Sequence, residues 1–134
     1  MAEASTPIHG VTPYLMVRGA AEAAEFYKRA FGAEEVMRTA AEDGKRLIHC
    51  HLKINGADVM MSDEFPEYGA SLGEGPNGVT LHLQVDDADE WWARATDAGA
   101  TVVMPLAEQF WGDRYGQVRD PFGHTWSIGA PKKS

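Results

Sequence analysis

TPYLMVRGAAEAAEFYKRAFG, the stretch from residue 12 to residue 32, predicts a short strand that runs directly into a helix. Its first part, Thr12 to Val17, is apolar and rich in residues that favour strands. After Gly19, small and aromatic side chains recur at helical spacing on one face. Gly32 can adopt the left-handed conformation that commonly follows a helix, so we expect the helix to end there.

The same pattern returns in residues 81–99, LHLQVDDADEWWARATDAG. A short apolar strand ends at Val85, an aspartate precedes the next helix, Trp91 contributes to its apolar stripe, and Gly99 stands at its end. Because the order of strand, cap, acid, aromatic stripe and terminal glycine is preserved, the chain is predicted to contain two copies of one module.

Further strands are expected after each helix. In the first module they are predicted at 34–40, 46–54 and 57–63, with tight turns at 42–45 and at Asn55-Gly56. In the second module we expect a strand at 78–85, a helix at 87–98 and strands at 101–104, 114–119 and 124–128. Pro105 is expected to end the strand that begins at residue 101, and residues 120–123 to form a turn.

This order predicts one α+β domain over residues 1–134, with tandem βαβββ modules at about 11–63 and 78–129 and a Gly- and Pro-rich linker at 64–77. One helix would cover one face of each four-stranded sheet, and a cleft between the other faces is a natural small-molecule site. A ferredoxin-like arrangement, in which the βαβ units share one sheet, is the alternative. The run of three strands after each helix favours separate modules.

The overall composition limits the classes of partner. The net charge of −8 argues against nucleic acid and against anionic membrane surfaces, and it is compatible with a cationic small molecule. No apolar run is long enough to span a membrane. The N-terminal MAEASTPIHG lacks the pattern of a signal peptide, and a single cysteine, Cys50, excludes an internal disulfide. We therefore expect a cytoplasmic protein.

Three motifs resemble one branch of a known superfamily. They are PYLMVRGAAEAAEFYKRAFGAE at 13–34, Phe110-Trp111-Gly112, and DPFGHTW at 120–126. The chain resembles the vicinal oxygen chelate (VOC) superfamily, which includes glyoxalase I, extradiol dioxygenases and bleomycin-resistance proteins, and within it the PhnB-like branch. The resemblance implies two βαβββ modules that form a U-shaped cleft, usually in a homodimer.

The resemblance also implies where a metal would be held. Catalytic members hold a divalent metal with four side chains, typically His, Gln or Glu, on the first and last strands of each module. The matching positions here are Thr12, Met61, Thr80 and Ser127, and none of them is a usual ligand for such a metal. We therefore expect no metal cofactor, with a divalent metal as the alternative.

Strand alternation identifies the polar residues of the cleft. His49 and His51 share one side of their strand, and His82 shares a side with Thr80 in the second module. Ile48, Cys50 and Leu52, and likewise Val79, Leu81 and Leu83, are expected to face the helices. The full set of expected ligand-binding residues is Tyr14, His49, His51, Thr80, His82, Phe110, Trp111 and Gln117.

The three histidines are also the candidate catalytic residues. Histidines two apart on a strand can share a metal, and a histidine can act as general acid or base near neutral pH. The simpler interpretation is that His49, His51 and His82 are hydrogen-bonded lining of the cleft. The sequence thus favours a metal-free protein that binds a small organic ligand, similar to sequestration by bleomycin-resistance proteins. The alternative is a lyase, isomerase or dioxygenase that uses a divalent metal or a cleft histidine.

Overall fold

The computed structural model describes residue 8 and residues 10–132. The remaining residues, 1–7, 9, 133 and 134, lie outside this description, and most of the stretch judged for a signal peptide is among them. Module one comprises β1 (Tyr14–Val17), α1 (Ala20–Phe31), β2 (Glu34–Ala40), β3 (Leu47–Ile54) and β4 (Ala57–Asp63). Module two comprises β5 (Thr80–Gln84), α2 (Ala88–Ala98), β6 (Thr101–Glu108), β7 (Asp113–Arg119) and β8 (Thr125–Pro131).

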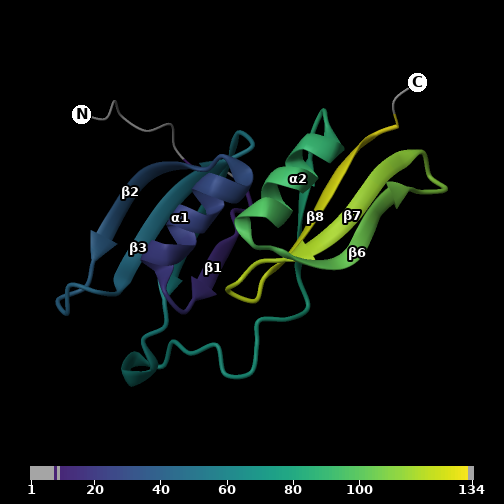
Figure 1. Ribbon diagram of the computed structural model, residues 1–134. Coiled ribbons are helices and arrows are strands. Elements are labelled where there is room, and N and C mark those ends of the chain that lie inside the picture. Colours follow the sequence, from purple (N-terminus) through teal and green to yellow (C-terminus); the bar gives the residue numbers. More distant parts are fainter. Residues whose placement is uncertain (1–7, 9, 133–134) are drawn as a thin grey trace.

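Each module forms its own four-stranded mixed sheet, which confirms the predicted α+β fold (Figure 1). The strand orders are β1-β4-β3-β2 and β5-β8-β7-β6, and in each sheet the first pair is parallel and the others antiparallel. Because the two sheets are separate, the ferredoxin-like alternative is wrong. Within the described part of the chain, no helix combines the length and the apolar character needed to cross a membrane.

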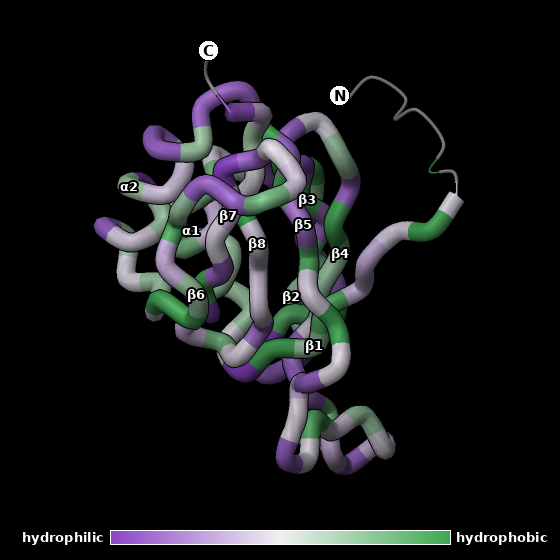
Figure 2. Tube along the Cα trace, turned by 90° about the vertical axis from the view of Figure 1, so that its right-hand side faces the viewer, coloured by the Kyte–Doolittle hydropathy of each residue, from purple (hydrophilic) through white to green (hydrophobic). Residues whose placement is uncertain are grey.

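The two helices lie side by side in the middle of the view in Figure 1 and make direct contact. Figure 2, turned by 90°, shows both helices on one side of the sheets. The core crosses the boundary between the modules, because Tyr27 and Phe31 of α1 pack on Trp126 of β8, with ring centroids 5.4 and 4.6 Å apart. The modules therefore share one apolar core and form one domain, while the opposite faces of both sheets stay open.

Asp120, just after β7, joins the first helix to the second module. Its buried carboxylate accepts hydrogen bonds through Oδ2 from the Tyr27 hydroxyl at 2.5 Å and from Trp126 Nε1 at 2.8 Å. Its Oδ1 accepts the backbone N–H groups of Phe122 and His124 at 2.9 and 3.0 Å. One side chain thus fixes the predicted turn at 120–123 and holds α1 against β8.

Two expected orientations and one strand end are wrong. Ile48 is exposed, because the pairing of β2 with β3 shifts between Thr39–His49 and Ala40–Leu47, and this bulge places Leu47 in the core instead. Val79 is also exposed, since it precedes β5. The strand that was expected to end at Pro105 continues to Glu108, because it lies at the sheet edge, where bulges interrupt its pairing and a proline is tolerated.

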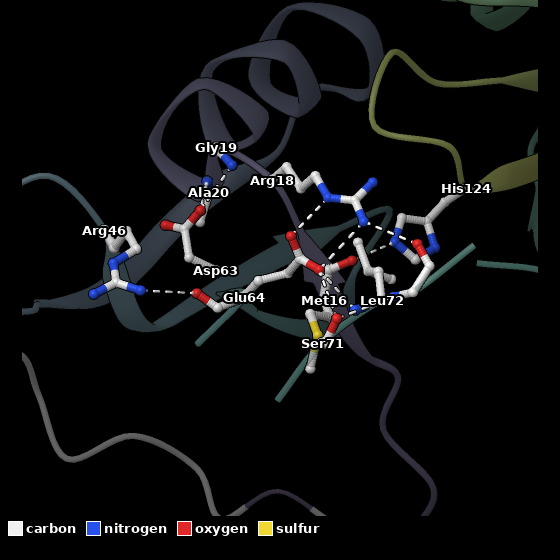
Figure 3. A network of polar contacts seen from close by, with 11 residues as sticks. Met16, Arg18, Gly19, Ala20, Arg46, Asp63, Glu64, Ser71, Leu72 and His124 are labelled. Carbon is white, nitrogen blue, oxygen red and sulfur yellow. Dashed lines mark hydrogen bonds and ion pairs between the residues drawn. The ribbon is translucent and has the colours of Figure 1, made fainter. Parts of the chain in front are cut away.

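The linker between the modules is fixed to β1 at its start. Glu64 accepts hydrogen bonds from Arg18 Nε at 2.6 Å and from the backbone N–H of Leu72 at 2.7 Å (Figure 3). Arg18 also donates to the carbonyl oxygen of Gly73 at 3.0 Å. A short 3₁₀ helix, Pro66–Tyr68, lies in this linker, which projects below the sheets in Figure 1.

Candidate functional site

A groove runs along the line where the two modules meet. It consists of two neighbouring hollows of about 490 and 250 Å³, which share Pro13, Thr80 and Leu81 in their walls. We call the two hollows together the seam groove. In the larger hollow β1 faces β5, and in the smaller hollow the β3–β4 hairpin faces β5, so each hollow has one wall from each module.

The larger hollow is closed at one end by the linker and by the turn before β8. The hollow is lined there by residues 76–79 of the linker and by Gly123 and His124. Gly123 has a φ of +97°, and a Cβ there would approach Pro76 to 3.0 Å, so this close packing requires glycine. His124 Nε2 donates to the carbonyl oxygen of Met16 at 3.0 Å, which holds the turn against β1 (Figure 3).

Tyr14 and His49 form a pair on the open face of the first sheet. The Tyr14 hydroxyl lies 2.7 Å from His49 Nδ1, and the two rings are 5.6 Å apart. Burial raises the pKa of the Tyr14 hydroxyl, so the phenol stays protonated at neutral pH and can donate to the imidazole. Tyr14 lines the larger hollow, so it brings this pair to the seam groove.

His51 is paired with a carboxylate that the sequence analysis missed. Its Nε2 lies 2.7 Å from Asp58 Oδ1, and Lys53 Nζ contacts the same oxygen at 3.1 Å. Hydrogen bonds from His51 and then Lys53 lower the pKa of Asp58, so this carboxylate is ionised at neutral pH and His51 Nε2 carries the proton. Asp58 lines the smaller hollow, whereas His51 is buried and does not line it.

His82 of β5 is held at both ring nitrogens. Its Nδ1 lies 2.7 Å from Ser127 Oγ on β8, and its Nε2 lies 2.8 Å from Gln84 Oε1. Tyr115 of β7 stacks on the ring, with centroids 5.8 Å apart. His82 lines the smaller hollow, so it presents a fixed imidazole to the seam groove.

The loop before β7 contains Phe110 and Trp111, and it is connected to His82 through Tyr115 of β7. Gln117 Nε2 donates to the Tyr115 hydroxyl at 3.0 Å, and Trp111 packs edge-on against the same ring at 5.5 Å. Phe110 contacts Trp111 and is 96% exposed. Of the predicted ligand-binding residues, Tyr14, Thr80 and His82 line the two hollows. His49 contacts Tyr14, and His51 contacts Asp58. Gln117 and Trp111 contact Tyr115, which stacks on His82, while Phe110 lies outermost.

The residues at the expected metal positions do not fit a divalent metal. Met61 lies in the apolar core, so the residue of β4 that faces away from the helix is its neighbour Met60. Ser127 does reach the open face, but its hydroxyl is paired with His82. Residue 8 and residues 10–132 include no group of three or more His, Cys, Asp or Glu side chains placed to hold a metal ion.

Asp58 was missed although the sequence contains a signal for it. The Asn55-Gly56 turn sets the register of the β3–β4 hairpin, which pairs Lys53 with Asp58 and His51 with Met60. Asp58 is therefore the diagonal neighbour of His51 on the open face. The contacts of His82 with Ser127 and Tyr115 carry no such local signal, because they depend on the parallel pairing of β5 with β8.

Comparison with known proteins places this fold in a family. The profile described as "Glyoxalase/Bleomycin resistance protein/Dioxygenase superfamily" matches residues 8–128. The uncharacterized protein Rv0887c of Mycobacterium tuberculosis is 50% identical over 128 residues, which cover 90% of this chain and 74% of the relative.

Solved structures agree with this assignment. TioX from Micromonospora sp. ML1 is 29% identical, with a TM-score of 0.72 over 94% of this chain and 98% of that one. The PhnB protein from Bacillus cereus, described as a putative 3-demethylubiquinone-9 3-methyltransferase, has a TM-score of 0.74 at 21% identity, with 91% of this chain and 99% of that chain covered. The similarity to the PhnB protein, at 21% identity, shows that the two chains share a fold and nothing more. From the profile match and the shared pair of βαβββ modules, we conclude that this chain belongs to the glyoxalase/bleomycin resistance protein/dioxygenase superfamily.

Proposed function

We propose that this protein binds a small organic ligand in the seam groove, without the four-ligand metal site expected of catalytic members of the superfamily. The observation that carries the proposal is the lining of the groove. Apolar side chains, among them Pro13 and Leu81, alternate with a few convergent polar groups such as Thr80 and His82. This combination is typical of small-molecule sites.

The proposal predicts that a large side chain at Thr80 blocks binding. Thr80 is exposed and lines both hollows, so the variant Thr80→Trp fills the groove from its middle without disturbing the core. The neutral dye N-phenyl-1-naphthylamine serves as a probe, because its fluorescence rises in apolar sites. We expect one dye site per chain and at least a tenfold loss of affinity in Thr80→Trp, since the pocket contacts are replaced by the indole.

Thr39→Trp is the matched control for this experiment. Thr39 is also an exposed strand threonine, but it lies on β2, away from the groove. It is expected to keep the affinity of the unmodified chain, and both variants should unfold at similar urea concentrations. Equal dye binding by Thr80→Trp and the unmodified chain would show that the seam groove is not the ligand site.

A second candidate function is supported by the contact between His51 and Asp58. A histidine whose Nε2–H is held by an ionised carboxylate keeps Nδ1 as a potential proton acceptor, which is an arrangement suited to general base catalysis. This supports a lyase or isomerase that uses His51 with Asp58 next to the smaller hollow, or one that recruits a metal there. Elemental analysis after incubation with Ni, Mn, Zn and Fe(II) separates the metal-dependent version from ligand binding alone, which predicts no stoichiometric metal.

We also propose that the protein is a homodimer. Support comes from large apolar side chains that remain exposed on the open faces of both sheets. Met37 and Tyr14 belong to the first sheet and Met104 to the second, and each is at least 40% exposed. A second copy could cover these faces and complete the U-shaped cleft that the resemblance implies. Light scattering that gives the mass of a single chain at micromolar concentration would rule this out.

A further inference from the structure

We propose that the larger hollow of the seam groove binds the negatively charged head group of a small organic anion, such as a carboxylate or a phosphate. This inference rests on the proposed ligand-binding function and names the chemical class of its ligand. It differs from the expectation drawn from composition, because a net charge of −8 is compatible with a cationic partner. The side chains that line the hollow carry positive charge, whereas the net charge of the whole chain is negative.

The lining of the larger hollow is the first support. Arg119 is the charged residue of this wall, and Thr80 and Thr125 add hydroxyl groups. His124 and Tyr14 also line the hollow, but they are already paired with the Met16 carbonyl oxygen and with His49. Among the described residues that line the hollow there is no aspartate or glutamate, although the chain has 20 acidic residues against 12 lysines and arginines. A carboxylate or phosphate would therefore meet hydrogen-bond donors and a positive charge without repulsion from the lining.

The second support is that Arg119 has no carboxylate partner within residues 8 and 10–132. Four other arginines form ion pairs with acidic side chains, namely Arg18 with Glu64, Arg38 with Glu35, Arg46 with Asp43 and Glu67, and Arg114 with Asp89. The guanidinium of Arg119 is thus available for an external anion. Arginine suits this role, because its planar fork of donors matches a carboxylate or phosphate in a bidentate contact.

The strand register places the donors in a line. Thr80 is the partner of Thr125 across β5 and β8, and Thr125 is the partner of Arg119 across β8 and β7. The three side chains therefore form one row on the open face of the second sheet, with two hydroxyl groups followed by a guanidinium. An anion held at Arg119 could also accept hydrogen bonds from the neighbouring threonine.

The same geometry orients the rest of the ligand. The apolar walls formed by Pro13 and Leu81 continue from this row into the smaller hollow, where His82 lies. A ligand with its charged group at Arg119 would thus lay an apolar body along the seam toward His82.

The test compares two dyes that differ chiefly in one charged group. 1-Anilinonaphthalene-8-sulfonate carries a sulfonate, and N-phenyl-1-naphthylamine is its neutral counterpart. We expect the sulfonate to bind at least tenfold more tightly at low salt, because a charged hydrogen bond adds about 1.5–3 kcal/mol. The variant Arg119→Gln should remove this preference and leave the affinity for the neutral dye unchanged.

Arg29→Gln is the matched control. Arg29 lies on α1, outside both hollows, and its replacement removes the same net charge from the chain. It should keep the preference for the sulfonate. Benzoate and phenyl phosphate as competitors then distinguish a carboxylate from a phosphate ligand, and displacement by either supports the proposal.

The outcomes separate this inference from the proposed function. Equal affinity for the two dyes, or an equal effect of Arg119→Gln and Arg29→Gln on the sulfonate, would overturn the anion site. In that case, binding of the neutral dye that Thr80→Trp abolishes would still support a ligand groove. If neither dye binds at the seam, both proposals are wrong.

Discussion

Replacement of Asp120 by alanine is expected to lower the free energy of unfolding by at least about 3 kcal/mol, because a donor that is buried without an acceptor costs about 1–3 kcal/mol. The change removes the acceptor for four donors at once, namely the Tyr27 hydroxyl, Trp126 Nε1 and the backbone N–H groups of Phe122 and His124. The turn that closes the larger hollow would lose its anchor as well. Urea titration followed by tryptophan fluorescence measures this loss.

Two milder variants keep the prediction testable if Asp120→Ala does not fold. Tyr27→Phe removes one of the four donors and should cost about 1–2 kcal/mol. Asp97→Asn removes a carboxylate from an exposed position of α2 and should change the stability by less than about 0.5 kcal/mol. A loss in Asp120→Ala no larger than in Asp97→Asn would show that this carboxylate does not join the modules.

The Tyr27 contact also has a signature in pH. Burial and then the charge of Asp120 raise the pKa of Tyr27 well above its ordinary value. Because the folded-state pKa is higher than the unfolded one, the stabilisation is complete below the unfolded pKa of about 10 and is lost as the pH rises above it. The stability difference between the unmodified chain and Tyr27→Phe should therefore shrink above about pH 10. A constant difference would argue against this contact.

The parts of the fold that follow from local signals could be predicted from the sequence. Both helices end at the expected glycines, and Gly32 and Gly99 have φ values of 66° and 118°. The Asn55-Gly56 turn sets the β3–β4 register, so the alternation of Cys50 and Leu52 toward the core was correct. These features depend on residues a few positions apart, which is why the pattern of one stretch predicts them.

The site depends on contacts that no local pattern contains. A one-residue bulge reverses the orientation of Ile48, and a sheet edge allows β6 to pass through Pro105. The row of Thr80, Thr125 and Arg119 exists because β5 pairs in parallel with β8, more than 40 residues later in the chain, and β8 pairs with β7. Sequence alternation assigned His82 to the groove, but only the strand register pairs it with Ser127.

Replacement of Asp63 by alanine is expected to cost about 3 kcal/mol of stability, since it removes the cap of α1 and leaves buried backbone donors unpaired. The residue before this helix is Gly19, which has no side chain to cap it. Asp63, at the end of β4, supplies the cap from a distant part of the chain (Figure 3). Its Oδ1 accepts the N–H groups of Gly19 and Ala20 at 2.7 and 3.0 Å, and its Oδ2 accepts that of Leu47 at 2.8 Å.

The second module provides an internal comparison, because there the cap is local. Asp87 precedes α2 directly and accepts the N–H of Glu90 at 3.1 Å, in a more exposed position. Asp87→Ala should therefore cost only about 1 kcal/mol, the usual effect of losing a helix cap. The difference between the two losses of stability would measure how much Asp63 contributes beyond capping the helix, through its hydrogen bond to Leu47 of β3. Equal losses in the two variants would show that Asp63 acts only as a helix cap.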